Sequence, residues 1–138
     1  AIMARGLRMK LAVSLIITAL GLYALVHLTL VTGHLWQSDW SPHALNHLLR
    51  GTVASLGLVL VIIVILLGPF LKKEPWAWWL VLMSFVFLYG GFWGGYVFTE
   101  FSVLWAKPAM SSLFILQTGL FAMGLLMSHT RVCGKITE

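Results

Sequence analysis

Charge and cysteine are the two things that this sequence has least of. Only 9% of its 138 residues are charged, whereas about a quarter of the residues in an ordinary soluble domain are. The hydrophobic share is 60% and the mean hydropathy is +0.96, which excludes a water-soluble monomer. The single cysteine, Cys133, excludes an intrachain disulfide, a thiol redox pair and a cysteine-based zinc site.

Catalytic motifs are also missing. The chain has no glycine-rich phosphate loop, no Gly-x-Ser-x-Gly turn and no His-Glu-x-x-His pair, which disfavours nucleotide enzymes and hydrolases. No Asp or Glu falls inside an apolar block, although a proton-coupled exchanger needs an acidic group in the middle of the membrane. Polar residues within the blocks, of which Gln117 is the most notable, are too few to line a channel.

What the sequence does have is four apolar blocks of roughly bilayer-spanning length, about 20 residues each. They run over about 11–32, 52–71, 76–99 and 109–128. Because unpaired backbone groups are very costly in hydrocarbon, and no alternating strand pattern is present, the blocks should be helices. The first block is interpreted as a span, not as a cleaved signal peptide, because no small-x-small cleavage site follows it. The sequence therefore predicts an all-α integral membrane protein, a single-domain bundle of four transmembrane helices.

Lysine and arginine lie at the ends of the blocks and predict the topology. Seven of the nine fall on one side, in the N-terminal segment, the connection between the second and third blocks, and the C-terminal segment, and only Arg50 and Lys107 fall on the other. The positive-inside rule then places both termini in the cytoplasm and residues 33–51 outside, in a bacterial inner membrane. Since the basic residues do not form one face, a nucleic-acid partner is not expected.

Small residues spaced four apart mark helix contact faces in membranes. The third block has two such glycine pairs near its outer end, with aromatic residues beside them, and either a neighbouring helix or a flat ligand such as a lipid, quinone or pigment could lie there. This patch consists of Gly90, Gly91, Gly94 and Gly95, flanked by Trp93 and Tyr96. A weaker small face on the first block, formed by Ser14, Thr18 and Gly21, is expected to dock against the third or fourth block.

Histidines cluster at the outer ends of the first two blocks. Four of the five lie within 21 positions, and they are His27, His34, His43 and His47. Residues seven apart on a helix share a face, so His27 and His34 would stack if the first helix continues that far. His27 lies inside the first block, where an ionisable residue is by default a functional candidate.

The second helix is expected to start inside the outer segment. Ser41 followed by Pro42 is typical of an N-cap and a first helical residue. His43 and His47 would then stand at i and i+4 and project from one helix face, which is the spacing of helix-borne metal ligands.

Two carboxylates, Asp39 and Glu100, could complete a metal site with the histidines at the outer surface. Neutral imidazole suits zinc, copper, iron or nickel, and a tetrapyrrole held between His27 and His47 is also conceivable. The competing interpretation is that the histidines are ordinary interfacial polar residues, and Arg50, one turn after His47, would repel a bound cation.

The segment Trp40-Ser41-Pro42-His43-Ala44, followed by His47, resembles a Trp-x-Pro-His-Ala-x-x-His signature of small four-span membrane proteins of unknown function. The resemblance covers about eight residues and the number of spans. It implies the same four-helix layout, with an outer segment that leads into the second helix, and it implies no activity.

Three functions are compatible with these features. The first is an accessory subunit of a larger electron-transfer, photosynthetic or oxidase complex. Such a subunit supplies helix-packing surface to other membrane subunits and holds a lipid, quinone or pigment. It is not an enzyme on its own. The second is a small membrane protein or enzyme that binds a metal or haem through the outer histidines. The third, a transporter or channel, has the least support in the sequence.

Overall fold

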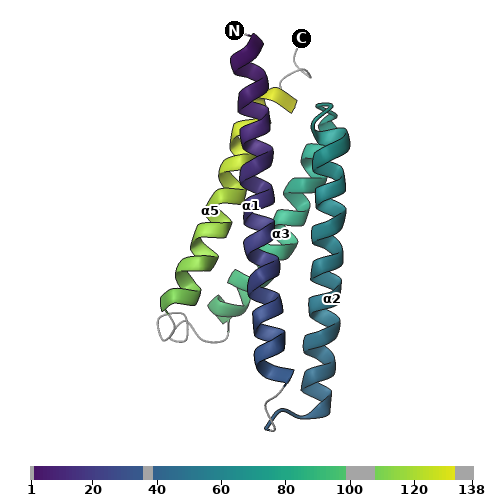
Figure 1. The fold of residues 1–138 in the computed structure, drawn as a ribbon, viewed down its shortest axis with the longest axis vertical. Coiled ribbons are helices and arrows are strands. Elements are labelled where there is room, and N and C mark those ends of the chain that lie inside the picture. The colour runs from purple at the N-terminus through teal and green to yellow at the C-terminus, as the bar shows by residue number, and fades with distance from the viewer. Residues whose placement is uncertain (1, 36–38, 99–107, 133–138) are drawn as a thin grey trace.

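The computed structural model describes residues 2–35, 39–98 and 108–132 of the chain, and this part is all-helical. Its elements are α1 (Ile2–Leu35), α2 (Pro42–Ile65), the π-helical turn η1 (Leu66–Phe70), α3 (Pro75–Phe98) and α5 (Pro108–Val132). Four helices of the described part are long and apolar enough to cross a membrane. Figure 1 shows the start of α1, the α2–α3 connection and the end of α5 at one end of the bundle, and the start of α2 at the other.

Parts of the outer segment 33–51 are helical. α1 continues to Leu35, and α2 begins at Pro42. The Ser41 side chain accepts a hydrogen bond from the backbone N–H of Ala44 at 3.2 Å, so one of the unpaired donors of the first turn is satisfied at the helix start that Ser41 and Pro42 predict.

Gly68 and Pro69 do not end the second span. The chain continues through them as a π-helical turn, in which Leu71 N–H donates to the Leu66 carbonyl at 3.3 Å. The wider turn accommodates Pro69, which has no N–H to donate. The helix ends after this turn, where Lys73 adopts a left-handed backbone with φ 64°.

The tightest helix contact joins α1 to α5. A Cβ added to Gly124 would lie 2.7 Å from the Ala12 carbonyl oxygen and 2.5 Å from Ile16 Cγ1, so the two backbones can approach this closely only at a glycine. The expected docking face of α1 was therefore wrong. Ser14, Thr18 and Gly21 are exposed, and the buried face of α1 is the one that includes Ala12 and Ile16.

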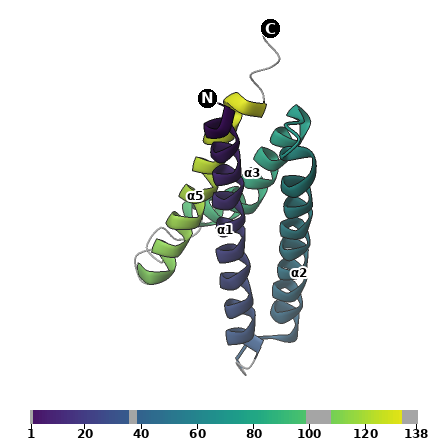
Figure 2. The ribbon, with the colours of Figure 1, turned by 45° about the horizontal axis from the view of Figure 1, so that its top comes forward.

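α3 completes the core from behind α1 in the view of Figure 1. The Trp78 Nε1–H donates to the carbonyl of Leu125 in α5 at 3.2 Å, and the ring of Tyr89 meets that of Phe121 at 5.8 Å. Figures 1 and 2 show α1 flanked by α5 on one side and α2 on the other. Large aliphatic side chains along α2 and η1 point away from this core, and they include Val53, Leu60, Val61 and Val64 of α2 and Leu67 of η1. These apolar outer surfaces indicate a lipid bilayer environment.

Candidate functional site

The first turns of α2 bring two imidazoles into direct contact. The Nε2 atoms of His43 and His47 are 3.1 Å apart, and the two rings meet edge to face with centroids 4.5 Å apart. Both side chains are exposed. At this distance the Nε2–H of one ring can donate a hydrogen bond to the unprotonated Nε2 of the other, so the two Nε2 atoms face each other.

His27 of α1 lies across from this pair. His27 and His47 line the same pocket of about 300 Å³, which is completed by Leu48, Gly51, Thr52 and Ser55 of α2. The His27 ring stacks on Tyr23 with centroids 4.0 Å apart, and its Nδ1 is 3.0 Å from the Tyr23 carbonyl oxygen, so this carbonyl can accept a hydrogen bond from Nδ1–H. The α1–α2 hairpin thus brings His27 and His47, the two residues that a tetrapyrrole would need, to one pocket.

Of the remaining predicted ligands, only the side chain of Asp39 is among those that the structure describes. Asp39 is exposed in the turn before α2. His34 lies in α1, with its side chain outside what the structure describes, and Glu100 lies outside the described residues altogether. Among the side chains that are described, no three from His, Cys, Asp and Glu come close enough together to hold a metal ion. Any metal bound by His43 and His47 would therefore take its other ligands from water or from a group outside this set.

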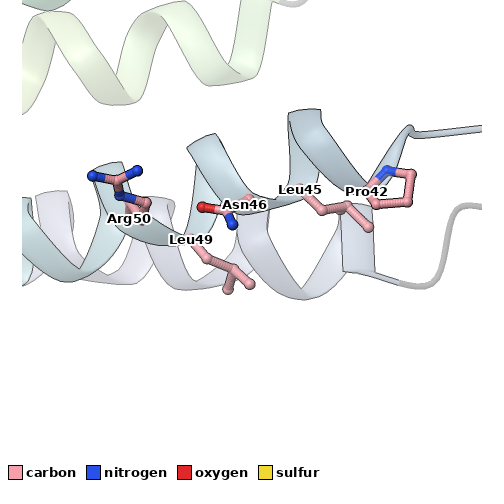
Figure 3. Close-up of a pocket in the computed structure, with 5 residues that line it drawn as sticks. All are labelled: Pro42, Leu45, Asn46, Leu49 and Arg50. Atoms are coloured by element: carbon pink, nitrogen blue, oxygen red, sulfur yellow. The ribbon is translucent and has the colours of Figure 1, made fainter.

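Arg50 lies one turn beyond His47 and lines a different hollow of α2. Figure 3 shows this hollow with its lining residues, Pro42, Leu45, Asn46, Leu49 and Arg50. All of them come from the first turns of one helix. The hollow is therefore a shallow depression in the surface of α2, which no second element encloses among the residues that the structure describes.

Within the described residues, no other helix covers Gly90, Gly91 and Gly94 of the α3 glycine patch. Gly90 and Gly91 are exposed. A Cβ at Gly91 or Gly94 would meet nothing within 4 Å, and one at Gly90 would meet only Val86 of the same helix. The described residues therefore provide no neighbouring helix at this patch, although the glycine spacing is typical of a helix contact. Gly95 and Tyr96 belong to α3, but their surroundings fall outside what the structure describes.

Trp93 was expected to flank the glycine patch, but its side chain is hydrogen-bonded to α5. Its Nε1–H donates to the Thr118 hydroxyl at 3.2 Å, and that hydroxyl donates in turn to the Phe114 carbonyl at 2.6 Å. Tyr89, next to Gly90 in sequence, is 1% exposed and points into the core. Trp93 and Tyr89 therefore lie on a different face of α3 from the glycines next to them in sequence, because residues adjacent in a helix point about 100° apart.

A polar layer crosses the bundle, with one member from each helix: the buried Tyr23 (α1), Tyr89 (α3) and Gln117 (α5), and the half-buried Ser55 (α2). The Tyr23 ring lies 5.8 Å from that of Tyr89. Since α1 and α5 are antiparallel and meet at Ala12 and Gly124, Gln117 lies level with Ala19, one turn from Tyr23.

Two members of this layer lack partners within the described part of the chain. The Tyr89 hydroxyl and both polar atoms of the Gln117 amide are buried without a hydrogen bond. In the sequence Gln117 stands out as a polar residue in an apolar block, whereas Tyr23 and Tyr89 read as ordinary aromatic residues. A polar side chain at a similar depth in each of the four blocks is the signal that could have identified the layer.

The comparisons with known proteins give no family for this fold and site. No family model, no curated protein and no solved structure matches the chain. The geometry of the described residues is therefore the basis of the functional argument.

Proposed function

We propose that this chain is an accessory subunit of a larger membrane complex, inserted as a four-helix bundle with both termini in the cytoplasm. The observation that carries the proposal is a stripe of exposed residues along the whole outer face of α1, spaced alternately four and three apart. The stripe consists of Leu7, Leu11, Ser14, Thr18, Gly21, Leu25, Leu28 and Thr32, and all eight are exposed.

This spacing is the 3.5-residue repeat with which helices pack along their length. Any helix with one buried face leaves an exposed face with this spacing, so the residue types along the stripe decide what covers it. The centre of the stripe is formed by Ser14, Thr18 and Gly21, the small residue types through which membrane helices approach closely. A partner helix fits this face better than lipid alone does.

The hydroxyls in the stripe support the same conclusion. Thr32 donates to the Leu28 carbonyl at 2.9 Å and is thereby satisfied within α1. The hydroxyls of Ser14 and Thr18 make no hydrogen bond within the described part of the chain. An unpaired hydroxyl in hydrocarbon is unfavourable, so these two groups would gain by bonding to a polar group on a second helix.

The uncovered glycine face of α3 offers a second surface, for another subunit or for a flat lipid, quinone or pigment. Figure 1 shows α1 in front of the bundle and α3 behind it, so the chain could be inserted between other components. Complexes of the electron-transfer, photosynthetic or oxidase type suit a subunit that contributes helix surface and few reactive groups.

Two matched substitutions test the proposal. Gly21 and Gly57 are both exposed in the middle of a helix, and a Cβ at either would meet nothing within 4 Å. Gly21→Leu should release the chain from its complex, because the new side chain separates α1 from its partner helix. Gly57→Leu is the control, because it lies on the aliphatic α2, and it should leave the complex intact. The measurement is the mass of the assembly extracted from native membranes in a gentle detergent. A wild-type chain that extracts as a monomer, or two variants with the same behaviour, would overturn the proposal.

A further inference from the structure

His43 and His47 are held in place by the helix start that carries them. Ser41 caps α2 through the 3.2 Å hydrogen bond from Ala44 N–H, and Pro42 fixes the first turn. Both imidazoles are therefore carried by an ordered helix turn, and binding a ligand between them would not require a loop to fold. Such pre-organisation favours binding because less conformational freedom is lost.

The distance between the two nitrogens fits a shared metal ion. With zinc–nitrogen bonds of 2.0–2.1 Å and tetrahedral angles, two ligating nitrogens lie about 3.3 Å apart. The Nε2 atoms of His43 and His47 are 3.1 Å apart. To bind one ion, both rings turn about their side-chain torsions until the two Nε2 lone pairs point at it, and the metal then replaces the proton that one ring shares with the other.

From this geometry we infer that His43 and His47 form a binding site for a divalent transition-metal ion at the start of α2. The ion is held by two imidazole nitrogens, and its remaining coordination positions are open to water. Imidazole favours Cu²⁺, Ni²⁺ and Zn²⁺ over the hard cations Mg²⁺ and Ca²⁺, which prefer oxygen ligands. This inference does not depend on assembly into a complex, so the two proposals can fail separately.

The open positions also define what the site can do. A closed structural zinc site has four protein ligands, whereas a site with fewer leaves room for water or for a ligand from another molecule. His27 lines the pocket next to His47 but is not close enough to form a three-residue group with the pair. The site is therefore suited to reversible metal binding and not to the folding of the bundle.

Zinc titration of the untagged full-length protein in detergent tests the inference. Metal is first removed with a chelator, and Zn²⁺ is then added in competition with a coloured zinc indicator. We expect one Zn²⁺ per chain, unaffected by excess Mg²⁺. His43→Ala and His47→Ala should each lower the affinity at least about tenfold, since even the loss of a group that only supports a ligand costs 10–100-fold. His129→Ala is the control, because His129 is also exposed but packs against Trp78 near the end of α5.

A spacing variant separates geometry from histidine content. Exchanging His47 and Leu48, by His47→Leu with Leu48→His, keeps the composition but moves the second imidazole off the shared face. Zinc affinity should fall as far as it does in His47→Ala, while circular dichroism shows unchanged helix content. Absence of zinc binding by the wild type, equal binding by all variants, or full binding by the exchanged variant would each overturn the inference and leave the pair as interfacial polar residues.

Discussion

Gly124 of α5 faces Ala12 of α1 so closely that a methyl group on the glycine would lie 2.7 Å from the Ala12 carbonyl oxygen. This contact fixes the register of the two antiparallel helices. It thereby determines which residues of α1 face α5 and which form the exposed stripe. The surface that we propose for a partner thus depends on this glycine.

Gly124→Ala should destabilise the bundle by about 1–3 kcal/mol, because overpacking forces the backbones apart. The control is Gly119→Ala in the same helix, where the added Cβ meets nothing within 4 Å. It should have little effect or stabilise slightly, since alanine is the better helix former. Thermal unfolding in detergent measures both, and equal stability of the two variants would show that the α1–α5 contact is looser than described.

The sequence was sufficient to predict the four helices and the capped start of α2, because apolar block length and the Ser41-Pro42 pair are local signals. It was not sufficient to predict which face of α1 is buried. Both faces are apolar and both contain small residues, so neither stands out in a membrane helix. Gly124 and Ser128 in the fourth block are small residues spaced four apart, and this pair could have indicated which face of the fourth helix contacts the first.

The candidate site was partly predictable for the same reason. The i, i+4 spacing predicted that His43 and His47 project together, and their Nε2 atoms are 3.1 Å apart. That His27 shares a pocket with His47 depends on how α1 packs on α2, and the polar layer depends on the register of all four helices. These are long-range relationships, which no local pattern encodes.

Gln117→Leu should stabilise the protein by about 1–3 kcal/mol, because it removes a buried amide that has no hydrogen-bond partner and replaces it with an apolar side chain of similar size. Gln117→Glu should do the opposite, since it buries a carboxyl group at the same position. Unfolding in detergent measures both changes. A marked loss of stability in Gln117→Leu would mean that the amide is hydrogen-bonded in the folded protein, for example to an internal water.

Ser41→Ala should loosen the first turn of α2 by about 1 kcal/mol, because the backbone N–H of Ala44 loses its acceptor. The effect should appear as faster hydrogen exchange at Ala44 and its neighbours, and as weaker zinc binding by His43. Ser41→Asn retains a capping oxygen and should preserve both properties. If Ser41→Ala exchanges no faster than the wild type, the cap does not hold this turn in solution.

The orientation of the bundle can be measured with single cysteines, because Cys133 is the only native one and Cys133→Ser removes it. Asp39 and Lys73 are exposed and lie in connections at opposite ends of α2. In spheroplasts, a thiol reagent that cannot cross membranes should label Asp39→Cys directly and Lys73→Cys only after permeabilisation, since the basic ends of the helices stay in the cytoplasm. Labelling in the reverse order would contradict this topology and place the His43–His47 pair inside the cell. The pair would then take its metal from the cytoplasm.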